Sequence, residues 1–197
     1  MGGSTVRGLG EVGRVVLVIA RFAEDVGWAA SFPGEVVVVQ KDRDLPNVGR
    51  EASSWLWFME TAAVDPDATY AFLQGDPTAH GVGPACIRRV DAFTPIGSVV
   101  LSCGLDGSPN HPDLPLAERA REWFGAELRA PIGFHAGAMF LAPGRLLLTR
   151  PREWYADLRR RVERDEKGPW VMERMWSLAW AIPGPPEGIH MRTGTSP

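Results

Sequence analysis

The stretch EVVVVQKDRDLPNVGRE, residues Glu35–Glu51, joins an apolar run, a charged loop and the start of a helix. The run Val36–Val39 is continuously apolar and β-branched, a pattern typical of a strand buried on both faces of a parallel sheet. In the loop, Pro46 fixes its own φ and favours an extended conformation in the residue before it. Asn47 is expected to cap the helix, because its side-chain oxygen can accept from a free N–H one turn later. The stretch therefore predicts a strand–loop–helix unit.

The helix that starts here is expected to run from Val48 to about Ala63, with its apolar residues at helical spacing. The free N–H groups at its N-terminus favour anions. Arg50 is expected to contact a phosphate or to pair with a neighbouring acid. Glu51 is either a general base or a complement of the helix dipole, and the second role is favoured.

The buried-strand pattern recurs on both sides of this unit, with helical segments in between. The other expected strands of the sheet are Val15–Ala20, Thr69–Leu73 and Ser98–Ser102, followed by a small-residue strand over His135–Ala142 and a last helix over Pro169–Ile182. Alternating strands and helices predict a single α/β domain, with a mostly parallel sheet flanked by helices. The domain is expected to span residues 14–182, between a glycine-rich lead-in at 1–13 and a Pro/Gly-rich tail at 183–197.

The composition of the chain does not indicate a nucleic acid or a membrane as its partner. The chain has 197 residues, 45% of them hydrophobic, and a net charge of −3, so no basic field indicates a nucleic acid. No apolar run is long enough to cross a membrane. The two cysteines, Cys86 and Cys103, form no C-x-x-C motif and are expected to be reduced thiols, as is usual in the cytoplasm. A small-molecule substrate is the expected partner.

Polar side chains follow each of the first three expected strands. In open parallel sheets, ligands bind beyond the carboxyl ends of the strands, so these residues are expected to line one cleft. They are Arg21, Glu24 and Asp25 after the first strand, Lys41, Asn47, Arg50 and Glu51 after the second, and Gln74, Asp76 and His80 after the third.

Four candidate residues carry open alternatives. Asp76 and His80 are either site residues or a turn-capping aspartate and a surface histidine. Glu173, with Trp176 on the same side of the last expected helix, is an acid/base candidate because apolar surroundings raise a carboxylate pKa; its alternative is an internal salt bridge to an arginine. His135 could act as a base or ligand, although a structural hydrogen-bonded role is favoured. The loop Gly104–Pro115 has a length that is often functional.

Six motifs occur together in this order: VIARFAEDVGW, LPNVGRE, FLQGDP, AGAMF, RPREWY and ERMW, the first starting at Val18 and the last ending at Trp176. In this combination the chain resembles a domain-of-unknown-function family from fungi and bacteria that is distantly related to nucleotide-sugar glycosyltransferases. The resemblance covers Val15 to Trp180. It implies a glycosyltransferase-A-like fold with a nucleotide-binding α/β half.

The resemblance also implies a chemistry. Glycosyltransferases of this fold hold a divalent metal on an Asp-x-Asp motif, which neutralises the diphosphate leaving group. Here the matching position reads Gln74-Gly75-Asp76, so Asp76 is the expected ligand for Mg²⁺ or Mn²⁺. The diphosphate of a nucleotide-sugar donor is expected at Val48–Arg50. Glu173 or His80 would then take the proton of the acceptor.

A second class of function stays open at this stage. The chain is short for a glycosyltransferase with a full acceptor domain, and the motif supplies one carboxylate instead of two. Both features favour a metal-independent acid/base enzyme of small-molecule biosynthesis, such as a cyclase, lyase or hydrolase, on the same fold. A non-catalytic binding protein is the third alternative.

Overall fold

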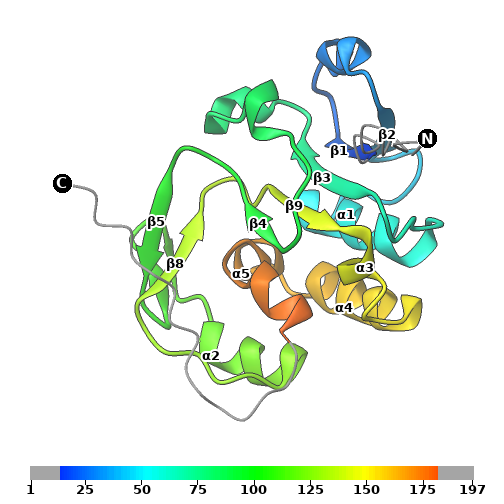
Figure 1. The fold of residues 1–197 in the computed structure, drawn as a ribbon. Helices are drawn as coiled ribbons and strands as arrows, with labels where there is room; N and C mark the ends of the chain where they lie inside the picture. Colours follow the sequence, from blue (N-terminus) through cyan, green and yellow to red (C-terminus); the bar gives the residue numbers. More distant parts are fainter. Residues whose placement is uncertain (1–13, 182–197) are drawn as a thin grey trace, which may run out of the picture.

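The computed structural model describes residues 14–181, and they form one mixed α/β domain (Figure 1). The expected lead-in at 1–13 and the tail at 183–197 lie outside the described residues. A five-stranded sheet has the order β2-β1-β3-β9-β4. Its strands are β1 (Val15–Arg21), β2 (Glu35–Gln40), β3 (Thr69–Gln74), β9 (Phe140–Pro143) and β4 (Thr94–Pro95).

The first three strands are parallel, as their apolar runs predict. β1 lies between β2 and β3, with Val18 opposite both Val37 and Phe72. Its five central residues are buried, as is usual for an inner strand covered on both faces. β9 then runs antiparallel to β3, and β4 antiparallel to β9. The sheet is therefore mixed, with a parallel half that ends at the candidate site.

Helices cover the sheet. α1 (Arg50–Thr61) packs against α4 (Arg152–Arg164), and both contact α5 (Gly168–Met175), which continues into the 3-10 turn η5 (Trp176–Trp180). Trp55 of α1 is fully buried and makes edge contacts with the rings of Phe72 and Phe140 on the sheet. Short elements complete the chain: η1 (Gly27–Ser31), η2 (Pro77–His80), η3 (Pro84–Cys86) and α3 (Gly144–Leu147). None of the helices in the described part combines the length and apolar character of a membrane span.

Residues 96–139, here called the insertion, lie between β4 and β9 and extend to one side of the sheet (Figure 1). β5 and β8 of the insertion pair antiparallel with each other, β6 pairs with β7, and α2 runs into the π-helical turn η4. The bounds are β5 (Val100–Cys103), β6 (Gly107–Ser108), β7 (His111–Pro112), α2 (Leu116–Arg119), η4 (Ala120–Phe124) and β8 (Ile132–His135).

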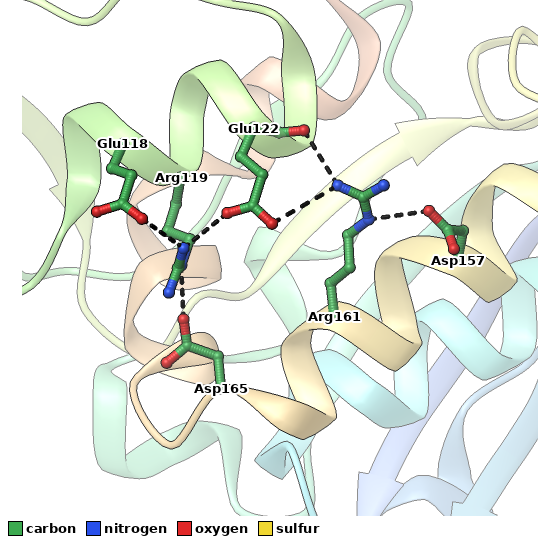
Figure 2. A network of polar contacts seen from close by, with 6 residues as sticks. All are labelled: Glu118, Arg119, Glu122, Asp157, Arg161 and Asp165. Atoms are coloured by element: carbon green, nitrogen blue, oxygen red, sulfur yellow. Dashed lines mark hydrogen bonds and ion pairs between the residues drawn. The ribbon is translucent and has the colours of Figure 1, made fainter.

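Ion pairs attach the insertion to α4 (Figure 2). Arg119 of α2 donates to Asp165 at the end of α4 over 2.7 Å and to Glu122 over 2.6 Å. Arg161 of α4 donates to its helix neighbour Asp157 and to the backbone oxygen of Glu122. The insertion is therefore held both by strand continuity and by this polar contact with a core helix.

Three predictions about elements are wrong. Ser98–Ser102 does not join the central sheet, because β5 pairs with β8 in a separate ribbon. The expected strand His135–Ala142 is split by a turn between β8 and β9, where Gly137 and Ala138 both have positive φ. The last α-helix ends at Met175 instead of continuing to Ile182, which lies outside the described residues.

Candidate active site

A cavity of about 250 Å³ lies beside the carboxyl end of β3, between the start of α1, α5 and the insertion. Arg50, Glu51, Gln74 and His80 reach it from the sheet half, and Glu173 reaches it from α5. The cavity thus brings together five of the residues that the sequence singled out. Its other lining residues are Leu101, Ser108, Asn110, His111, Phe134, Ala136, Gly137, Pro169, Trp170 and Arg174.

The N-terminus of α1 enters the cavity through a left-handed turn. Gly49 is the N-cap at φ +69°, and Arg50 follows at φ +49°, an uncommon conformation for a residue with a side chain. Asn47 is not the cap, contrary to expectation, and its side chain is exposed. The Arg50 guanidinium lies 5.8 Å from the ring centroid of Trp170 and 3.5 Å from the Glu51 carboxylate. The turn therefore places one cation and one acid at the cavity.

Glu51 is a partly buried acid, with 13% of its side chain exposed. Burial raises the pKa of its carboxyl group above the usual value, and the charge of Glu173 raises this pKa further. Arg50 and the backbone N–H of Glu51 act in the opposite direction. Desolvation is the largest cause, so Glu51 holds its proton to a higher pH than an exposed glutamate does.

Gly137 connects three side chains of the site. Its carbonyl accepts a hydrogen bond from Gln74 Nε2 over 3.0 Å, and its N–H donates to Glu173 Oε1 over 2.8 Å. The ring of His80 packs so closely against this glycine that an added Cβ atom would lie 2.7 Å from the ring. This backbone position therefore fixes the mutual arrangement of the amide, the carboxylate and the imidazole.

Arg174 forms the floor of the site. Its side chain is 1% exposed, lies 4.2 Å over the Phe134 ring, and donates to Glu173 Oε2 over 3.0 Å and to the carbonyl of Trp170 over 2.7 Å. Its Nε has no hydrogen-bond acceptor within residues 14–181. Glu173 therefore takes part in the internal salt bridge that the sequence left open as its alternative role.

His111 contacts the same arginine. Its Nδ1 lies 3.3 Å from Arg174 Nη2, and its ring lies against Trp170 with 5.4 Å between the centroids. Burial, followed by the charge of Arg174, lowers the pKa of His111. A guanidinium can only donate, so Nδ1 accepts and the neutral ring carries its proton on Nε2. His111 is accordingly a hydrogen-bond donor at neutral pH.

The candidate residues at the end of β1 and directly after it lie outside the cavity lining and stabilise their own turn. Arg21 donates to the backbone oxygen of Glu24 and to the side chain of Gln40. The Glu24 carboxylate accepts from the N–H groups of Phe22 and Ala23, and that of Asp25 accepts from Gly27. Their polar groups are thus used locally, so the predicted single cleft contains only part of the expected set.

Asp76 does not face the cavity either. Its carboxylate is exposed and caps η2, accepting from the Thr78 hydroxyl over 2.6 Å and from the Thr78 N–H over 3.1 Å. The Thr78 hydroxyl is the main cause of the lowered pKa of Asp76. Among residues 14–181, no three His, Cys, Asp or Glu side chains are grouped as metal ligands. One exposed capping carboxylate does not fit the Mg²⁺ or Mn²⁺ site that the sequence predicts at this position.

The contacts of three further candidate residues indicate structural roles. Lys41 is buried beneath the loop before α1 and does not line the cavity. His135 Nδ1 lies 3.1 Å from the carbonyl oxygen of Gly97, consistent with its favoured structural role. Trp176 is buried in the core and stacks on Trp180 with 6.2 Å between centroids.

Sequence reasoning missed His111, Trp170 and Arg174. His111 belongs to the loop that was noted for its length, and Arg174 directly follows Glu173 in the ERMW motif. Trp170 gave no separate signal beyond its place in the last helix. Comparisons with models of protein families, with curated proteins and with solved structures give no match for this chain.

Proposed function

We propose that the cavity is the active site of an enzyme that carries out metal-independent acid/base chemistry on a small anionic molecule. The observation that carries this proposal is the pair Glu51 and Glu173 in one cavity. Glu51 is partly buried and has a raised pKa, whereas Glu173 accepts from an arginine and a backbone N–H. Two carboxyl groups in such different surroundings are the usual arrangement of an acid and its partner base.

In this proposal Glu51 donates a proton to the substrate. Desolvation raises the pKa of Glu51, and a raised carboxyl pKa favours the role of general acid. Glu173 or His80 receives a proton, since both line the cavity and both are ordered by Gly137. His111 contributes a hydrogen bond from Nε2, on the tautomer that its contact with Arg174 requires.

An anionic group on the substrate is supported by Arg50. Its side chain is 58% exposed, it stands at the N-terminus of α1, and its nearest acid is Glu51, whose raised pKa weakens the competing negative charge. A guanidinium beside free N–H groups at a helix N-terminus binds carboxylates and phosphates well.

Nucleotide-sugar transfer is the second candidate. It is favoured by the position of the cavity beside the carboxyl ends of parallel strands, where nucleotides bind in open α/β sheets. It would place the diphosphate against Arg50 and would use Glu173 or His80 as the base. The exposed capping role of Asp76 speaks against the metal step of that mechanism.

A thermal-shift and turnover screen separates the candidates. One arm contains metabolite carboxylates and phosphate monoesters in EDTA, and the other contains UDP, GDP and their sugar conjugates with Mn²⁺. A ligand at 100 times its Kd adds about 2.7 kcal/mol of stability, which such a screen detects. We expect hits in the EDTA arm that Arg50→Ala abolishes.

Variants then test the roles. Glu51→Gln and Glu173→Gln should keep binding and lose turnover by about 10²–10⁴-fold, the usual contribution of acid/base groups. Glu127→Gln, at an exposed glutamate outside the cavity, is the matched control and should behave as the wild type. Binding of UDP or GDP only with Mn²⁺, lost in Asp76→Asn, would replace this proposal with sugar transfer.

A further inference from the structure

Lys41 is a buried cation whose hydrogen bonds go to one loop. Lys41 is 4% exposed. Its Nζ donates a hydrogen bond to the carbonyl of Val48 over 2.6 Å and lies 3.5 Å from the carbonyl oxygen of Pro46. Its own N–H donates to the carbonyl of Arg21, so its backbone is tied to the end of β1. The ammonium group thus joins the central sheet to the loop directly before α1.

That loop ends in the left-handed turn at Gly49 and Arg50. The turn has little freedom on its inner side, where a Cβ on Gly49 would lie 2.7 Å from Ser53 and 3.3 Å from Glu163. A positive φ at Arg50 costs free energy and persists only where its surroundings hold it. On the loop side, the turn is stabilised by the hydrogen bond from the Lys41 ammonium group to the carbonyl of Val48, two residues before Arg50.

Burial of the Lys41 ammonium group is unfavourable for folding. Burial lowers the pKa of Lys41 to about 8, against the partial compensation of Glu163 and Glu51. A buried charge of this kind disfavours the folded state relative to an apolar side chain of similar volume. A buried ionisable group with a shifted pKa near a cavity is a candidate for a functional role.

We propose that Lys41 is a positioning residue of the candidate active site, whose ammonium group holds the turn that presents Arg50 and Glu51 to the cavity. This inference rests on the proposed function of that site. Charge-assisted hydrogen bonds are about twice as strong as neutral ones, so deprotonation of Lys41 loosens the turn without releasing it. The site is then best assembled below the pH at which Lys41 titrates.

The charged groups around Lys41 come from three segments. α4 contributes Glu163 and Arg159, α1 contributes Glu51, and Asp42 follows Lys41 in the chain. The three acids raise the pKa of Lys41 and Arg159 lowers it, while burial remains the largest effect. Because Glu51 titrates as well, its contribution has to be separated in any measurement.

The chain has two lysines, Lys41 and Lys167, which makes a direct NMR test practical. Lysine side-chain and backbone amide signals of the full chain are followed from pH 6 to 10, with Lys167→Met assigning the two lysines. Lys167 is the matched control, since its Nζ also donates to a carbonyl, that of Asp113 over 2.7 Å, and does not line the cavity.

We expect the Lys41 signal to titrate near pH 8 and the amides of Arg50 and Glu51 to shift with the same midpoint. The shift should persist in Glu51→Gln, which removes the second titration. Lys41→Met should place both amides at their alkaline positions throughout, and Lys41→Arg should restore the neutral positions.

Amides of Arg50 and Glu51 that stay fixed while Lys41 titrates would overturn the inference, and this wild-type result decides even if Lys41→Met fails to fold. The readout needs no substrate. Coupled amides in a protein that fails every turnover screen would overturn the proposed function and leave the positioning role standing.

Discussion

Gly137 is the residue at which the site depends most on the absence of a side chain. Its φ is +88°, its N–H and carbonyl are hydrogen-bonded to Glu173 and Gln74, and the His80 ring occupies the space that a Cβ would need. Two other glycines allow the effect of the positive φ to be distinguished from the effect of the close contact with His80. Gly125 has a positive φ of +65° with no atom within 4 Å of an added Cβ, and Gly133 has neither a positive φ nor a close neighbour.

Alanine at these three positions should destabilise the protein in graded steps. Gly133→Ala should change the free energy of unfolding by less than about 0.5 kcal/mol. Gly125→Ala should lower it by about 1–2 kcal/mol through backbone strain alone. Gly137→Ala should lower it further, because the His80 ring must also move. Urea unfolding measures the series, and equal losses at Gly137 and Gly125 would show that the clash with His80 costs nothing.

Glu51→Gln should stabilise the protein at neutral pH. The pKa of Glu51 is raised in the folded state, so between its unfolded value of about 4.3 and its folded value the folded state binds more protons. The free energy of unfolding therefore falls as pH rises through that window, and the penalty stays in full above it. Glutamine avoids the penalty.

The measurement is urea unfolding of wild type and Glu51→Gln from pH 4 to 8. The difference between them should grow with pH and then level off above the folded pKa. Glu127→Gln is the control with no expected trend, since its carboxylate is exposed. A constant difference over the whole range would contradict the raised pKa.

The expectation that polar residues after strand ends share one cleft holds for some of these residues and fails for others. Arg50 and Glu51 were expected at the cavity from their place after the second strand and at a helix N-terminus, and they were found in its lining. Asp76 and Asp25 were not, because a short acid in a turn finds a backbone or hydroxyl donor two residues away. The rule that polar groups gather at strand ends does not distinguish these two uses.

At the scale of elements, the contact between α4 and the insertion depends on Asp165. This carboxylate accepts from Arg119 over 2.7 Å and from the N–H of Lys167 over 2.9 Å (Figure 2 shows the arginine contact). Asp157 on the same helix pairs with Arg161 but is about half exposed. Substitution of each aspartate therefore allows a partly buried ion pair to be compared with a solvent-exposed one.

Asp165→Ala should lower the free energy of unfolding by about 1–3 kcal/mol, because Arg119 and the N–H of Lys167 both lose an acceptor. Asp157→Ala should lower it by less than about 1 kcal/mol, as is usual for exposed ion pairs. Urea unfolding at low and at high salt measures both. Equal losses would mean that the contact with the insertion adds nothing to stability.

The same scale shows why part of the fold was predictable. Continuous apolar runs identified β1, β2 and β3 as strands. β1 and β3 are inner strands buried on both faces, as such runs predict. β2 is instead the edge strand, and within it only Val39 is buried, so the expectation of a strand buried on both faces is wrong for Val36–Val39. The run at Val99–Leu101 has similar composition but is exposed, with Val100 at 65%. Composition does not specify a strand's partner, and here the fourth place in the sheet is taken by β9, whose residues are all buried.

For the molecule as a whole, the cavity lies where the sheet half, α5 and the insertion meet. The reactivity of the two free cysteines can be used to measure how often the insertion separates from the rest of the domain. Cys103 ends β5, is buried, and has a thiol pKa raised first by that burial, whereas Cys86 is partly exposed. Only a thiolate reacts readily, so Cys103 is doubly protected.

Labelling with a thiol reagent should therefore be biphasic, with Cys86 modified first and Cys103 only when the insertion opens. Cys86→Ser isolates the slow phase, and Asp165→Ala should accelerate it by loosening the insertion from α4. A ligand of the cavity should slow it, since Leu101 and Phe134 of the insertion line that cavity. Equal rates at both thiols would indicate that reagent reaches Cys103 without any opening of the insertion.

The enclosure of Lys41 also has a use in bioconjugation. Of the two lysines in the chain, one is hidden beneath the loop before α1, so an amine-reactive dye or cross-linker finds one accessible lysine side chain, Lys167. Lys167 is the N-cap of α5, the helix that carries Trp170 and Glu173. Succinimide chemistry above pH 8 would thus attach a fluorophore to Lys167, close to the cavity, in addition to the α-amino group, which reacts first at lower pH.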